Sequence, residues 1–325
     1  MSPLALAPLL ACVWAADPMG PAAGERSYGV LLLGEGGDLN WKSAVDSIRQ
    51  ALSSKGLPME FAQGPADAKE IQRAVSLLEG RGVKRIVVVP LYLSSYSDVM
   101  DENRYLFGIR EKQPAAYLSS LHRMGAQAQE RIKTKVPIAL TKALDDSDAI
   151  VGILAARAKA QSRAPESEVL VLVGQAPTAK EGLQDWTSTV SALAEKVRQK
   201  VGFKLAQAAA LSENGNQRSR NASEAEVHKA VVDLHRKGSV VVVPLELSQG
   251  VVHVRLPRVL DGVFARYDGK PILPDPEIAK WVADSAAAGA KLPDMRVFKN
   301  SGSDFSTMHA APIDFGTPIG APGGQ

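Results

Sequence analysis

The stretch VVVPLYLSS at residues 87–95 returns as VVVPLELSQ at residues 241–249. Each copy is an apolar run that ends in polar residues, which is typical of a buried parallel strand and the turn that follows it. The prolines of the two copies, Pro90 and Pro244, stand 154 residues apart. The repeat therefore predicts two equivalent halves of one chain, with a cleft between them.

Apolar runs of strand length alternate with amphipathic helical stretches around each copy. In the first half, strands are predicted at 28–33, 58–62 and 84–92, with helices at 41–54 and 66–80. In the second half, strands are predicted at 168–173, 203–210 and 239–247, with helices at 183–200 and 222–237. A short strand, an acidic cap and a helix close the halves, at 137–160 and 271–289. This order predicts an α/β fold in which each half is a mainly parallel sheet flanked by helices.

Composition divides the chain into five segments. They are an apolar leader at 1–16, a first half-domain at 27–160, a linker at 161–167, a second half-domain at 168–290 and a Gly-, Pro- and Ser-rich tail at 299–325, which is predicted to be disordered. Pairing Pro137 with Pro271 gives an offset of 134 residues, against 154 for the repeat. The first half is therefore predicted to carry an insertion of 20 residues within 105–135, where the pattern is helical.

The leader MSPLALAPLLACVWAA has the length and apolar character of a signal peptide, with Val13-Trp14-Ala15 as a cleavage site. Because Leu9-Leu10-Ala11-Cys12 also has the pattern of a lipobox, Cys12 is a candidate for a lipid anchor. The expected location is exported, periplasmic or lipid-anchored, and the alternative is a cytoplasmic protein with an N-terminal extension. Cys12 is the single cysteine, so disulfides, thiolate metal sites and cysteine nucleophiles are excluded from the remainder of the chain.

Composition also limits the partners. The 325 residues carry 38 Lys and Arg against 35 Asp and Glu, a net charge of +3. Because the basic residues are scattered among acidic ones, a nucleic-acid partner is not expected. No stretch after the leader has the roughly 18 apolar residues that a membrane span requires.

Three motifs together resemble a known family. They are an apolar strand that ends in Gly34-Glu35-Gly36, the stretch VVPLELSQGVVHV at 242–254, and PILPDPEI at 271–278. This pattern resembles the sirohydrochlorin chelatases, the small class II chelatases that insert cobalt or iron into a tetrapyrrole. The resemblance covers 27–290 and is strongest at 239–282. It implies two chelatase-like half-domains that face each other across a cleft for a tetrapyrrole and a divalent metal ion, cobalt or iron.

The family places one metal-binding histidine after the first strand and a second after the fourth. His253 fills the second position, and the first copy has Val99 opposite it. Glu35 and Gln175 stand at the first position in the two copies. Imidazole and carboxylate both bind first-row divalent ions and both accept protons, whereas glutamine offers only an amide. If the active pair belongs to the second half, as in the two-domain relatives, it is Gln175 with His253, which is one working group short, and Gln175 then serves only as a hydrogen-bonding group toward the substrate. If the halves share a site, Glu35 completes it with His253, and these two are the expected catalytic and metal-binding residues.

A tetrapyrrole with many carboxylates also requires polar and cationic groups around the cleft. The candidates for these substrate contacts are Arg255, Arg258, Ser94 and Ser248, together with Lys42 and Arg104 in the first half. The other histidines, His122, His228, His235 and His309, are predicted to face solvent. A nucleotide site is disfavoured, because Leu39 stands where G-x-G-x-x-G requires its third glycine.

Two functions follow from the resemblance. One is a sirohydrochlorin cobalto- or ferrochelatase, a lyase of the type that serves cobalamin biosynthesis. The alternative is an exported, non-catalytic carrier of a metal or a tetrapyrrole that retains the fold. Because sirohydrochlorin is made in the cytoplasm, cleavage of a signal peptide favours the carrier.

Overall fold

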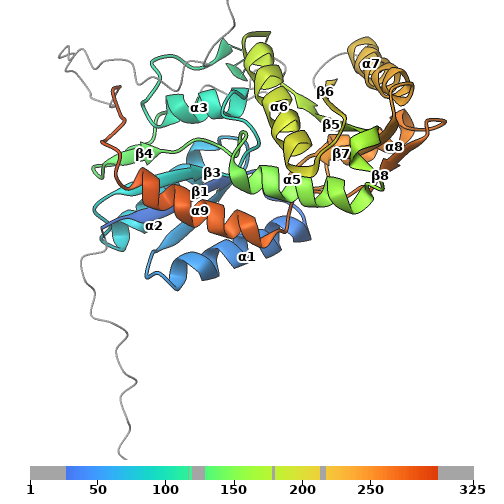
Figure 1. Ribbon diagram of the computed structural model, residues 1–325. Coiled ribbons are helices and arrows are strands. Elements are labelled where there is room, and N and C mark those ends of the chain that lie inside the picture. The colour runs from blue at the N-terminus through green and yellow to red at the C-terminus, as the bar shows by residue number, and fades with distance from the viewer. Residues whose placement is uncertain (1–26, 116, 119–128, 178–179, 213–216, 299–325) are drawn as a thin grey trace, which may run out of the picture.

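The computed structural model describes residues 27–115, 117–118, 129–177, 180–212 and 217–298 (Figure 1). The predicted leader and tail, and with them His122 and His309, lie outside the described residues. The described chain forms two parallel four-stranded sheets, with strand orders β2-β1-β3-β4 and β6-β5-β7-β8. The predicted α/β architecture of two sheets flanked by helices is confirmed.

The first sheet follows the predicted order closely. Its strands are β1 (Gly29–Gly34), β2 (Met59–Gln63), β3 (Ile86–Pro90) and β4 (Ile138–Leu140), and its connecting helices are α1 (Leu39–Ser53), α2 (Ala68–Gly80) and α3 (Asp98–Leu106). β1 is buried along its whole length, because helices cover both faces of the sheet. Asp38 begins α1 by accepting a hydrogen bond from the Trp41 backbone N–H at 3.0 Å.

The second sheet repeats this plan. Its strands are β5 (Glu168–Ala176), β6 (Leu205–Ser212), β7 (Ser239–Leu245) and β8 (Ala265–Tyr267), and its connecting helices are α6 (Lys180–Val201), α7 (Gln217–His235) and α8 (Val251–Val259). The helices α5 (Asp148–Gln161) and α9 (Pro276–Gly289) follow the closing strand of each half, and a 3-10 turn, Pro165–Ser167, precedes β5. No helix among the described residues is long and apolar enough to cross a membrane.

The closing strand of the second half differs from the prediction. β8 pairs Ala265 with Val240, whereas in the first half β4 pairs Ile138 with Ile86. Since Ile86 and Val240 are 154 residues apart and Ile138 and Ala265 are 127 apart, the extra length in the first half is 27 residues rather than 20. The apolar Ile272, which favoured a strand at 271–273, is buried instead in a loop, where its N–H donates to the Glu246 carbonyl oxygen.

Part of the predicted helical insertion is irregular. α3 ends at Leu106, and residues 107–114 and 129–135 form turns, bends and segments without regular secondary structure. Only Ala115, Tyr117 and Leu118 are helical among the described residues of this stretch that follow α3.

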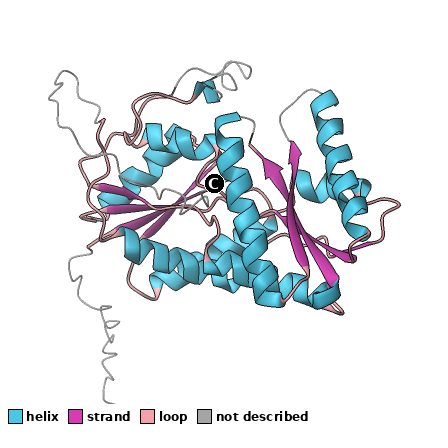
Figure 2. Ribbon diagram, turned by 45° about the horizontal axis from the view of Figure 1, so that its top comes forward, coloured by secondary structure: helices cyan, strands magenta, loops and turns pink. Residues whose placement is uncertain are grey.

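The two halves exchange their last helices. α9 packs against α1 and β3 of the first half, and α5 packs against α6 and β7 of the second (Figure 1). One apolar core therefore includes Leu32 and Val87 of the first sheet together with Leu172 and Val241 of the second. Figure 2 shows helices lying between the two sheets. The segment at 161–167 divides the strands of the two sheets in the sequence. Each sheet is nevertheless covered by one helix from the other side of this segment, α9 on the first sheet and α5 on the second.

Candidate functional site

The loops at the carboxyl ends of the two sheets meet between the halves. Ser248, which follows β7, donates its hydroxyl to the Asp38 carboxylate, which follows β1 and begins α1. The pKa of Asp38 is lowered although burial alone would raise it, because Ser248 and the backbone N–H groups of Trp41, Gln249 and Asn40 bond to the charged form. A loop of the second half thus contacts the start of the first helix of the first half.

A matching contact exists on the other side of the interface. Gly182 lies in the first turn of α6, and a Cβ atom at this position would lie 2.8 Å from the carbonyl oxygen of Tyr96. Tyr96 belongs to the loop after β3, which is equivalent to the loop after β7. Each of these loops therefore contacts the first helix of the other half. This arrangement gathers the predicted site loops in one region, at the edge where parallel α/β sheets bind ligands.

His253 is the third residue of α8 and is half-buried. Its Nδ1 atom lies 3.2 Å from the carbonyl oxygen of Gly269. Because a carbonyl oxygen only accepts hydrogen bonds, Nδ1 carries the proton in this contact. The lone pair of Nε2 is then available to a metal ion or to a proton, as in metal-binding histidines generally.

The carboxylate of Glu246 lies beside His253 and was not among the predicted site residues. One oxygen, Oε1, accepts the Val252 N–H at 2.9 Å, and the other, Oε2, accepts the His253 N–H at 3.0 Å. Burial raises the pKa of Glu246, and the backbone N–H groups of Gly250, Val252 and His253 oppose that rise. The signal was present in the repeat, since Glu246 replaces Tyr92 of the first copy.

Glu35 and Gln175 occupy equivalent places at the ends of the first strands. Glu35 directly follows β1 and is exposed, whereas Gln175 is half-buried within β5, opposite Leu211. The pKa of Tyr92 is raised mainly by burial and further by the charge of Glu35, which places this carboxylate near the loop after β3. Within the described segments, no three His, Cys, Asp or Glu side chains gather to hold a metal ion.

Arg255 does not line the cleft as predicted. Its side chain is buried, with Nε 2.6 Å from Glu224 Oε1 and Nη1 2.6 Å from the Ser212 carbonyl oxygen. Nη2 donates to the Arg220 carbonyl oxygen at 3.1 Å. The guanidinium therefore joins α8 to α7 and to the end of β6. Sequence alone did not reveal this role, because its partners come from distant segments.

The other predicted cations are also placed away from His253 or used in local contacts. Arg258 is exposed, but it follows His253 by five residues, which is about 140° around the helix. Lys42 pairs with Asp46 at 2.9 Å on α1. Arg104 pairs with Asp101 at 2.6 Å and donates to the Ser95 carbonyl oxygen at 2.8 Å.

The two predicted serines have different surroundings. Ser94 is buried, and its hydroxyl accepts the Tyr96 N–H at 3.1 Å, which shapes the loop after β3. Ser248 makes the contact between the halves described above. His228 and His235 are exposed on α7, as predicted, and the Nδ1 atom of His228 contacts the Val259 carbonyl oxygen at 2.8 Å.

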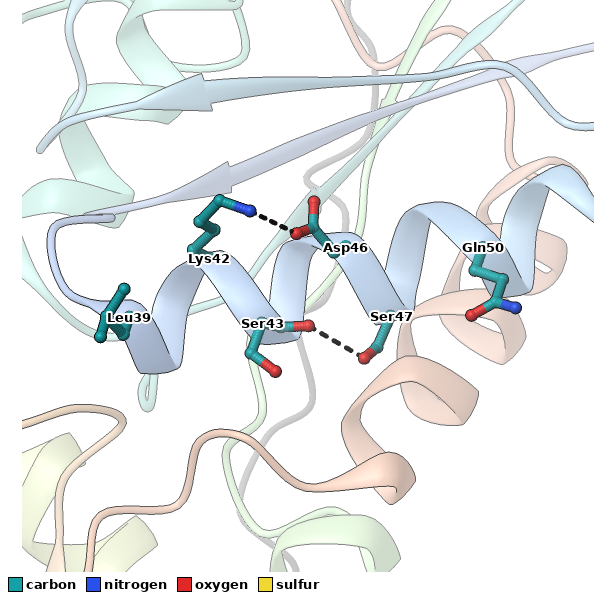
Figure 3. Close-up of a pocket in the computed structure, with 6 residues that line it drawn as sticks. All are labelled: Leu39, Lys42, Ser43, Asp46, Ser47 and Gln50. Carbon is teal, nitrogen blue, oxygen red and sulfur yellow. Dashed lines mark hydrogen bonds and ion pairs between the residues drawn. The ribbon is translucent and has the colours of Figure 1, made fainter.

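A hollow runs along the surface of α1 (Figure 3). All of its lining residues belong to one helix: Leu39, Lys42, Ser43, Asp46, Ser47 and Gln50. Lys42 is paired with Asp46, and the Ser47 hydroxyl donates to the Ser43 carbonyl oxygen at 2.9 Å. Its polar groups therefore bond mainly to each other along the helix surface.

The two pseudo-equivalent parallel sheets, whose strand ends meet between the halves, define a two-half chelatase fold. SirB from Bacillus subtilis with Fe3+ is 15% identical, with a TM-score of 0.56 over 82% of this chain and 96% of that chain. The sirohydrochlorin chelatase SirB from Bacillus subtilis subspecies spizizenii, in complex with cobalt, is 14% identical, with a TM-score of 0.51 over the same shares. No family model and no curated protein sequence matches this chain. The predicted resemblance to sirohydrochlorin chelatases is confirmed for the fold.

Proposed function

We propose that the protein binds a divalent metal ion and a tetrapyrrole between its two halves, with His253 as the metal ligand. The observation that carries this proposal is the Nδ1 contact to Gly269, which leaves Nε2 of the half-buried His253 available in the first turn of α8, after the carboxyl end of β7. The solved structures with this fold support cobalt or iron as the metal. The metal ion and the tetrapyrrole are the substrates of the protein if it is a chelatase, and its cargo if it is a carrier.

The finer proposal is insertion of cobalt or iron into sirohydrochlorin. Insertion requires a protein group that holds the ion while its waters exchange and a base that accepts the pyrrole protons. In this proposal His253 holds the ion, and the exposed carboxylate of Glu35 supplies a second oxygen ligand or accepts a proton. Gln175 contributes a hydrogen bond only.

A non-inserting carrier is the second candidate. It is favoured by the lack of a three-residue His, Cys, Asp or Glu cluster in the described part of the chain and by the buried position of Arg255. We propose that residues 1–16 export the protein, either as a cleaved signal or through a lipid at Cys12. Mass spectrometry of the mature N-terminus tests this, because an intact Met1 in the native protein contradicts export.

Removal of the His253 side chain tests the metal site. We expect His253→Ala to weaken Co²⁺ binding at least tenfold in a calorimetric titration, because the imidazole ligand is lost. His235→Ala is the matched control, since His235 is exposed on α7 away from the strand ends. Equal Co²⁺ affinity in the wild type and His253→Ala contradicts the proposal.

The absorption spectrum of sirohydrochlorin distinguishes the two functions. A chelatase forms the metallated product faster than a mixture of metal and sirohydrochlorin without protein, and does so over many turnovers. A carrier binds the pigment or the metal stoichiometrically and leaves the insertion rate at that of the protein-free mixture. If the protein shows no binding and no turnover with Co²⁺ or Fe²⁺, both functions are overturned.

A further inference from the structure

The two copies of the repeat begin the helix after the strand in different ways. In the first copy, Ser97 caps α3 with its own side chain, which accepts the Met100 N–H at 3.3 Å. In the second copy, the N-cap of α8 is Gly250, which has no side chain to do this. Instead, Glu246, four residues earlier in the chain, accepts the N–H groups at the start of α8. Its equivalent in the first copy, Tyr92, points its hydroxyl toward the Gly64 carbonyl oxygen at 3.5 Å instead.

Gly250 gives the Glu246 carboxylate the space it occupies. A Cβ atom at Gly250 would lie 2.7 Å from Glu246 Oε1, closer than real Cβ contacts allow. The carboxylate thereby reaches two N–H groups of the first turn, at 2.9 and 3.0 Å. Both oxygens accept N–H donors, which is the arrangement of an ionised carboxylate at a helix N-terminus.

The residue held by this cap is His253. α3 begins at Asp98 and α8 begins at Val251, an offset of 153 residues, and the buried positions of the two helices largely coincide at this offset. The structure therefore sets His253 opposite Met100, and not opposite Val99 as predicted. Met100 is buried in the apolar core of the first half. The copies therefore differ together at three linked places: the cap, the glycine that admits it, and the side chain at the third helical position.

A histidine in the first turn of a helix is a poor cation ligand without such a group. The free N–H groups of a helix N-terminus carry a partial positive charge, which opposes a metal cation bound one turn away. A carboxylate on those N–H groups offsets that charge, and it also holds the turn from which the imidazole extends. The first copy has no histidine at this position, and the acidic residues at the start of α3 are Asp98 and Asp101 of the helix itself rather than a residue of the preceding loop.

We infer that Glu246 is the positioning residue for His253, holding the start of α8 and offsetting its positive end so that Nε2 accepts a divalent cation. This inference rests on the proposed metal site. It assigns to Glu246 a role through His253 and not a direct bond to the metal.

The test compares two caps, using the full chain and Co²⁺ alone as the probe. Glu246→Gln keeps the length of the side chain but removes its charge, and Glu246→Ala removes the cap. Asp67→Asn is the matched control, because Asp67 caps α2 of the first half by accepting the N–H groups of Lys69 and Glu70, whereas His253 belongs to α8 of the second half. Far-ultraviolet circular dichroism verifies that each variant is folded.

We expect Glu246→Gln to weaken Co²⁺ binding about tenfold, while Asp67→Asn lowers the melting temperature and leaves the affinity within about twofold. Long-range ¹H–¹⁵N NMR of the metal-free imidazole should show the Nδ1–H form of His253 in the wild type and a loss of that preference in Glu246→Ala. If Glu246→Gln binds Co²⁺ as the wild type does while His253→Ala does not, the inference fails and the metal site stands. If the wild type does not bind Co²⁺, the proposed function fails, and an unchanged His253 tautomer in Glu246→Ala then overturns the positioning role as well.

Discussion

The side chain of Glu102 on α3 is fully enclosed, which is rare for a carboxylate. Gln113 Nε2 donates to its Oε1 atom at 2.7 Å, while Oε2 has no hydrogen-bond partner within the described structure. Burial raises the pKa of Glu102, and its contacts with Gln113, Gln129 and Arg110 offset only part of this. Burial therefore opposes ionisation of the Glu102 carboxylate, and the proposed function does not involve this residue.

Replacing Glu102 should change how stability depends on pH. Because the folded-state pKa is raised, the folded chain holds a proton that the unfolded chain releases, so the free energy of unfolding falls as pH rises above the ordinary glutamate range. We expect Glu102→Gln to flatten this fall in urea denaturation as the pH rises above about 4. Glu166→Gln, at an exposed position before β5, is the control. If the pH dependence of the free energy of unfolding is the same in Glu102→Gln as in the wild type, the pKa of Glu102 is not raised.

At the scale of elements, Arg255 holds α8, α7 and the end of β6 together. Its guanidinium donates to one carboxylate and two backbone carbonyl groups. The Glu224 carboxylate is partly exposed, so much of the stabilisation comes from the hydrogen bonds to the partly buried carbonyl groups of Ser212 and Arg220. The sequence placed Arg255 at a helix start near the site, and packing turned it away from the site.

We expect Arg255→Ala to lower the free energy of unfolding by about 2–3 kcal/mol, because it removes a buried side chain and leaves its partly buried acceptors unpaired. Urea denaturation followed by circular dichroism measures this. Arg258→Ala, on the exposed side of the same helix, should change stability by less than about 0.5 kcal/mol. Unchanged stability of Arg255→Ala together with weaker tetrapyrrole binding would restore the predicted substrate role.

At the scale of the whole molecule, the exchanged helices make one folding unit of two sheets. The C-terminal helix α9 covers β3, where a Cβ atom at Gly289 would lie 2.5 Å from Val87 Cγ1 and 2.8 Å from Thr141 Cγ2. This close approach ties the last helix of the described residues to the first sheet. Neither half as divided in sequence keeps all the helices that cover its own sheet.

Gly289→Ala should therefore destabilise both halves together. Overpacking against Val87 is expected to cost about 1–2 kcal/mol after the gain in helix propensity is deducted. Tryptophan fluorescence and circular dichroism should report one coincident unfolding transition, shifted to lower denaturant. Gly80→Ala, at an α2 position where a Cβ atom meets open space, is the control. Two separate transitions, only one of them shifted, would contradict a shared core.

Sequence periodicity predicted most strands and helices to within a few residues, because buried runs such as Val87–Val89 have a clear local pattern. It misplaced the last strand of the second half. At that edge, the half-exposed Ala265–Tyr267 pairs with β7, while the more apolar Ile272 is buried in a loop. A short edge strand owes its place to its partner and not to its own hydrophobicity.

The sequence by itself determined the duplicated α/β plan and placed His253 just after the repeated strand of the second copy, because the repeat and its loops are local in the chain. Only the tertiary structure decided which residues surround that histidine. It buried Arg255, joined Ser248 to Asp38 across the halves, and set Glu246 under the first turn of α8. The physical reason is that burial and charge at each position depend on segments that are distant in sequence and meet only when the sheets pack together.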